Sequence, residues 1–81
     1  MKKRSITIAG HETSIALEPA FWAALDAAAQ AASLPLNALV AQIDAERIRV
    51  SHPPNLASAI RVWLFERAQE KGELGSADLG R

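Results

Sequence analysis

Residues 13–25 read Thr-Ser-Ile-Ala-Leu-Glu-Pro-Ala-Phe-Trp-Ala-Ala-Leu and contain the junction that decides the fold. Up to Leu17 every second residue lies on one face, and this period of two predicts a strand with Ile15 and Leu17 buried. The same alternation leaves Ser14 exposed on the other face. A helix is expected to start directly after this strand, because Pro19 suits the first helical position. A strand that leads into an apolar helix indicates a small α+β protein.

A second strand is predicted on the N-terminal side of this junction. Residues 4–8 alternate in the same way, with Ile6 and Ile8 on one face and Ser5 and Thr7 on the other. Gly10 can adopt the positive φ of a turn. We therefore expect a hairpin of strands at about 4–8 and 13–17.

Three helices are expected after the hairpin. Apolar residues with helical spacing predict them at about 19–32, 36–49 and 55–71. The first has a stripe through Phe21, with Trp22 at its border, and Asn55 is a suitable N-cap for the third. A core of residues 1–50 would thus be joined through a linker, 51–54, to a packed third helix, with a flexible tail at 72–81.

Size and composition favour a homodimer. The chain has 81 residues, no cysteine and only 5% aromatic residues. Domains this small are marginal as monomers and commonly gain stability from a disulfide, a metal or a second subunit. A lone hairpin is also weak, and pairing with a second copy would complete it. We expect the core and dimer interface to include Ile15, Leu17, Phe21, Leu25, Leu39, Val40 and Ile43.

The charges of the chain are balanced overall but not locally. Nine basic and nine acidic residues cancel, whereas Lys2, Lys3 and Arg4 form a basic patch with no acid before residue 12. No apolar run approaches the roughly 20 residues that cross a bilayer, and no signal-peptide core follows the basic start. We therefore expect a cytoplasmic protein without a membrane partner.

These segments resemble a known family. Residues 13–25 are similar to the strand-to-helix junction of ribbon-helix-helix proteins, the superfamily of the Arc and MetJ repressors, and residues 34–44 are similar to its second helix. Residues 3–11 and 55–63 resemble a short bacterial subgroup of such domains, so that the likeness covers about residues 1–66. The resemblance implies an intertwined ribbon-helix-helix homodimer with an extra C-terminal helix. It also implies that paired strands enter the DNA major groove and that the second helix starts at a phosphate.

The sequence departs from this pattern in three respects. The outward positions of the strand, Ser14 and Ala16, are not the basic residues that commonly contact guanine. Pro35 stands where the second helix usually begins with Ser or Thr, although Ser33 or Asn37 could compensate. Two hairpins joined in a dimer would form a four-stranded sheet broader than the groove, unless the first strand separates as a basic arm.

The residues for catalysis or metal binding are missing. His11 and His52 are the only histidines, with no cysteine beside them, whereas a metal site needs three or four converging ligands. No nucleophile–base set and no glycine-rich phosphate loop is evident. We expect neither an enzyme nor a cofactor.

Two functions remain open. The first is a dimeric DNA-binding transcriptional regulator, of the kind that includes antitoxin-like repressors. The second is a dimeric adaptor that binds a protein partner and no DNA, which the near-zero net charge favours. The DNA-contacting residues would be Lys2, Lys3, Arg4, Ser5, Thr7 and Ser14.

Overall fold

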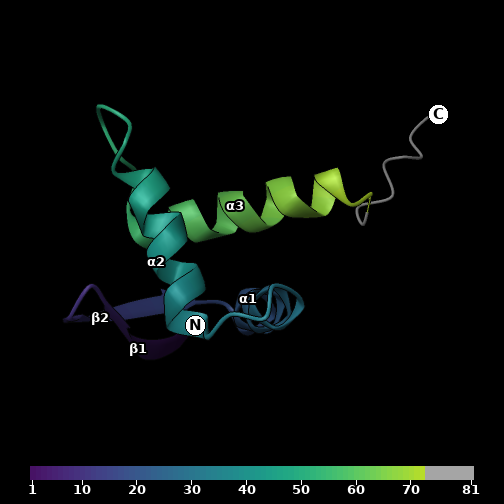
Figure 1. Ribbon diagram of the computed structural model, residues 1–81, viewed down its shortest axis with the longest axis horizontal. Coiled ribbons are helices and arrows are strands. Elements are labelled where there is room, and N and C mark those ends of the chain that lie inside the picture. Colours follow the sequence, from purple (N-terminus) through teal and green to yellow (C-terminus); the bar gives the residue numbers. More distant parts are fainter. Residues whose placement is uncertain (73–81) are drawn as a thin grey trace.

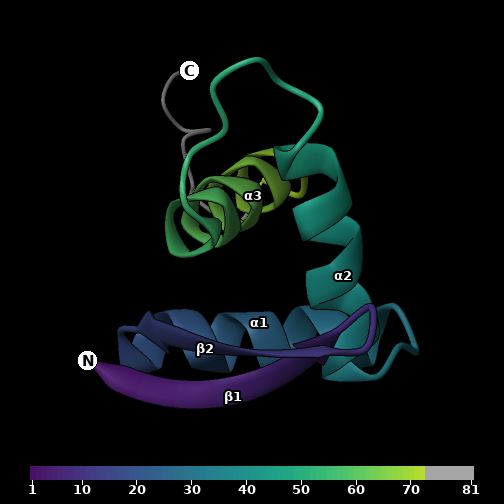
Figure 2. The ribbon, with the colours of Figure 1, turned by 90° about the vertical axis from the view of Figure 1, so that its left-hand side faces the viewer.

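The computed structural model describes residues 1–72 and contains a hairpin and three helices. The elements are β1 (Lys2–Ile8), β2 (His11–Leu17), α1 (Pro19–Ala31), α2 (Leu36–Arg47) and α3 (Leu56–Glu70). The hairpin lies beside α1, α2 rises steeply from that layer, and α3 lies above α1 and crosses it (Figures 1 and 2). The expected α+β order with an additional C-terminal helix is confirmed. The expected tail lies outside the described residues, except for Gly72.

The hairpin is longer than the alternation alone predicts, because its turn contains only two residues. Ala9 and Gly10 have φ values of 52° and 83°, the pair of positive values that a type I′ turn requires. Pairing therefore begins at once, with Ile8 opposite His11, and continues to Lys2 opposite Leu17. Both strands begin two residues earlier than expected, β1 at Lys2 and β2 at His11.

Helix α1 presents a different aromatic residue to the core than the sequence predicts. Trp22 is 2% exposed, whereas Phe21 is only half-buried. The buried positions Trp22, Leu25 and Ala29 follow the spacing of three and four residues that lines one helical face. Phe21 lies beside this face, where the Arg61 guanidinium is 5.7 Å from the centre of its ring.

The two later helices end and begin at residues with clear local roles. Helix α2 stops at Arg47, two residues earlier than expected, and Arg47 pairs with Asp44 at 2.8 Å. The same guanidinium donates to the carbonyl of Pro54, which ties the linker to α2. Asn55 is the N-cap of α3, as predicted, and accepts a hydrogen bond from the Ser58 amide at 2.8 Å.

All five elements contribute to one core within a single chain. Ile15 and Leu17 are buried, as the alternation predicts, and α3 adds Ile60 and Leu64. Of the residues expected in the core or dimer interface, all but Phe21 are buried without a second chain. The buried set is Ile6, Ile15, Leu17, Trp22, Leu25, Ala28, Ala29, Leu39, Val40, Ile43, Ile60 and Leu64.

An ion pair joins α3 to the strand-to-helix junction. Arg61 donates to the carboxylate of Glu18 at 2.9 Å. A backbone hydrogen bond at Glu18 itself and the hydrogen bond from Arg61 together lower the pKa of the Glu18 carboxyl. The carboxylate is therefore charged at neutral pH, and the pair is lost as the pH falls through this lowered pKa. The contact links α3 to the residue that precedes α1.

Candidate nucleic-acid interface

The outward face of the hairpin gathers small polar side chains around one lysine. Lys3, Ser5 and Thr7 alternate with the inward residues of β1 and are exposed. The strand register places Ser14 of β2 directly opposite Ser5. Such opposed residues share one face of a sheet, with Cβ atoms about 5 Å apart. Four of the six residues predicted to contact DNA therefore lie on a single surface.

The other two positions of that surface come from β2. Glu12 lies opposite Thr7, and Ala16 lies opposite Lys3. Glu12 is exposed and is the only acidic side chain among the outward residues of the two strands. The surface is thus basic at the Lys3 end and acidic at the Glu12 end.

Lys2 and Arg4 belong to the opposite face of β1, in phase with buried Ile6. Lys2 remains exposed, whereas Arg4 is half-buried. The Arg4 guanidinium donates to both carboxylate oxygens of Asp26, at 3.2 and 3.1 Å. It also lies 4.5 Å from the centre of the Trp22 ring, in cation–π geometry. The sequence predicts Arg4 among the phosphate contacts. In the structure its guanidinium contacts Asp26 and Trp22 of α1.

A hydrogen bond from Trp22 completes this contact between β1 and α1. The Trp22 indole nitrogen donates to the carbonyl oxygen of Lys2 at 2.7 Å. We call Arg4, Trp22, Asp26 and the Lys2 carbonyl the strand clamp. The clamp holds the first residues of β1 in the fold, so the structure does not show this strand as a separate basic arm. The alternation signals the inward position of Arg4, but its pairing with Asp26 depends on tertiary packing.

The start of α2 has no side-chain cap. Pro35 is the N-cap residue, and no side chain accepts a hydrogen bond there. Ser33 has a φ of 56° and ends α1, where the Leu34 amide donates to the Ala29 carbonyl at 2.9 Å. This is the arrangement of a Schellman motif. Neither Ser33 nor Asn37 caps α2 with its side chain, and both side chains are exposed.

Other kinds of site have little support in the described part of the chain. Within residues 1–72 no three His, Cys, Asp or Glu side chains gather closely enough to hold a metal ion. His11 and His52 are both exposed, at the start of β2 and in the linker. Across the same residues, no helix has the length and apolarity needed to span a membrane.

The hairpin followed by two helices defines a ribbon-helix-helix class of α+β protein, here with a third helix. The chain matches the family model described as a ribbon-helix-helix domain over residues 1–68. The protein belongs to the ribbon-helix-helix domain family. No curated protein and no solved structure matches it significantly. Domains of this family generally bind DNA as transcription regulators or antitoxins, are typically dimeric and are typically not enzymes.

Proposed function

We propose that the protein is a dimeric DNA-binding transcriptional regulator that contacts DNA with the outward face of its hairpin. The observation that carries the proposal is the grouping of Lys3, Ser5, Thr7 and Ser14 on one exposed surface. Hydroxyl groups donate to and accept from base edges, and a lysine contacts guanine or a phosphate. Lys2 adds a second cation at the same end of β1.

The width of the hairpin favours insertion of one hairpin as a unit. The major groove is about 12 Å wide and admits a two-stranded ribbon. Neighbouring strands lie about 4.8 Å apart, so the outer strands of a four-stranded sheet would be about 14 Å apart before side chains are added. The clamped hairpin already has two strands within one chain. Each subunit of the proposed dimer would therefore supply a complete ribbon.

Dimerisation is supported by surfaces that a single chain leaves uncovered. Val62 and Phe65 are each 54% exposed on α3, beside half-buried Phe21. If two copies associate, unfolding is coupled to dissociation, and we expect the melting temperature to rise with protein concentration. Calorimetry over a hundredfold range of concentration measures this. A concentration-independent melt, with a monomer in sedimentation equilibrium, would contradict the dimer.

DNA binding is expected to depend on the hairpin face in a residue-specific way. Each lysine–phosphate contact contributes about 0.9 to the slope of log affinity against log salt. Lys3→Gln should therefore weaken binding to all sequences and reduce that slope. Ser5→Ala and Thr7→Ala should change the preference among sequences, because base contacts specify and phosphate contacts position. The measurement is a titration against a library of genomic fragments at two salt concentrations.

Point variants are preferable to deletion of the N-terminus, because residues 1–4 include two members of the strand clamp. Arg49→Gln is the matched control, since Arg49 is exposed just beyond the end of α2 that lies away from the hairpin (Figure 2). This variant should retain both affinity and slope. Absence of binding above background at low salt by the intact protein would overturn the proposal.

The carboxylate of Glu12 on the same surface favours a second function, that of a dimeric adaptor that binds another protein. Glu12 faces outward beside Thr7, and a carboxylate there would repel phosphates. The net charge of zero also fits a protein that binds another protein. If the titration shows no DNA binding, a dimeric adaptor that uses this hairpin face or α3 becomes the better explanation.

A further inference from the structure

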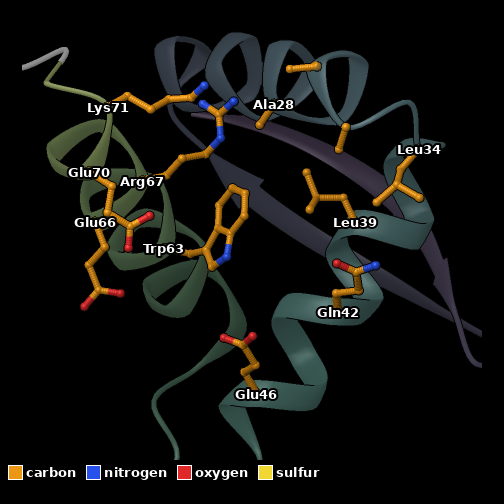
Figure 3. A pocket seen from close by; sticks show the side chains of 12 residues that line it. Ala28, Leu34, Leu39, Gln42, Glu46, Trp63, Glu66, Arg67, Glu70 and Lys71 are labelled. Atoms are coloured by element: carbon orange, nitrogen blue, oxygen red, sulfur yellow. The ribbon is translucent and has the colours of Figure 1, made fainter.

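A groove of about 580 Å³ lies on the opposite side of α3 from the exposed Phe65. Its floor is apolar and consists of alanines near the C-terminal end of α1 together with Leu34 and Leu39. Trp63 of α3 extends its ring along the groove (Figure 3). Small-molecule sites commonly have about 300–1,000 Å³ and a mostly apolar lining with a few polar groups. The groove has the size of such a site, and its lining combines this apolar floor with charged side chains from α2 and from α3 and its C-cap.

The polar groups of the groove are separated by charge. Arg67 and Lys71 lie at the end nearest Ala28 of α1, and Glu46 lies at the opposite end (Figure 3). Glu66 and Glu70 line the α3 side, farther from α1 than the two cations (Figure 3). The end of the groove beside α1 is therefore positive.

The two cations at that end have acidic neighbours on α3, but they form no ion pair with any side chain of the described residues. Arg67 lies in the last turn of α3 and Lys71 is its C-cap residue, so the two lie four residues apart on one side of the helix, where like charges repel each other. None of the three ion pairs within residues 1–72 includes either of them. An arginine presents paired donors that match a carboxylate, and a neighbouring lysine adds a point charge.

We propose that this groove binds a small planar carboxylate, with its apolar body against Trp63 and the alanine floor and its carboxylate at Arg67 and Lys71. An aromatic ring suits the Trp63 face, because offset aromatic pairs are favourable. The groove is separate from the hairpin face, so this proposal does not depend on whether the hairpin binds DNA.

The test uses naphthalene-1-acetate as the probe and its neutral amide, naphthalene-1-acetamide, as the matched ligand. The indole N–H resonances of the 81-residue chain report binding in ¹H–¹⁵N spectra. Trp63 is half-exposed in the groove, whereas Trp22 is buried and hydrogen-bonded elsewhere. We expect a saturable shift of the Trp63 resonance, little change at Trp22, and affinity for the carboxylate at least tenfold above that for the amide.

Variants separate the charged contact from nonspecific stacking. Arg67→Gln and Lys71→Gln should each weaken carboxylate binding about tenfold and leave amide binding unchanged, while Arg49→Gln should change neither. Equal affinity for acid and amide, or unchanged affinity in both groove variants, would overturn the proposal. So would a Trp63 shift that depends on protein concentration and not on the probe, because a second copy would then occupy the groove.

Discussion

Truncation after Ser51 is expected to abolish cooperative unfolding, because α3 supplies part of the only core that the described residues form. Ile60 is fully buried and Leu64 is 7% exposed, and α3 packs against α1, α2 and β2. Burial of each such side chain contributes about 1.5–3 kcal/mol. Domains have a total stability of only about 5–15 kcal/mol. The remaining 51 residues should aggregate or show no sharp thermal transition in circular dichroism.

A pair of point variants controls for the loss of chain length. Ile60→Ala should cost about 2–5 kcal/mol, as is usual for a buried aliphatic residue. Glu70→Ala on the same helix should cost little, because Glu70 is exposed. A soluble truncated protein with an unchanged melting temperature would show that α3 is an independent appendage.

Replacement of Trp22 by alanine is expected to cost about 3–5 kcal/mol, the usual range for a buried aromatic residue. Trp22 is 2% exposed, supports the Arg4 guanidinium and donates to the Lys2 carbonyl. Its loss therefore leaves a cavity and also removes the centre of the strand clamp. Chemical denaturation monitored by far-ultraviolet circular dichroism measures the change.

Two further variants separate the packing from the clamp. Trp22→Phe should retain much of the packing and lose the hydrogen bond, at a net cost of about 0.5–1.5 kcal/mol for that bond. Ile48→Ala is the exposed apolar control and should be close to neutral, because Ile48 is 58% exposed. A cost for Trp22→Ala as small as that for Ile48→Ala would mean that Trp22 is not buried as the structure describes.

Sequence patterns predict the order of the elements because each pattern is local. The period of two around Ile15 and the proline at position 19 define the strand-to-helix junction, and Asn55 defines the start of α3. The strand face of Ser5, Thr7 and Ser14 also follows from alternation, once the two strands pair in register.

Features that depend on contacts between distant residues could not be predicted in the same way. The choice between Phe21 and Trp22 as the buried aromatic residue depends on how α1 is rotated against the hairpin. The pairing of Arg4 with Asp26 spans 22 residues. A basic N-terminus therefore looks like a uniform charged patch in the sequence, whereas the fold assigns Lys3 and Arg4 to opposite faces.

The length of the turn at Ala9 and Gly10 determines which side chains of β1 point outward. Side chains alternate strictly along a strand, so one inserted residue in the turn exchanges the two faces of β1 relative to β2. Arg4 and Ile6 would then point outward, and Lys3, Ser5 and Thr7 would meet the core. Every residue of the hairpin face would still be present in the sequence, but only those of β2, such as Ser14, would still face outward. The composition of the outward face therefore depends on the number of residues between Ile8 and His11 as much as on the residues of the strands themselves.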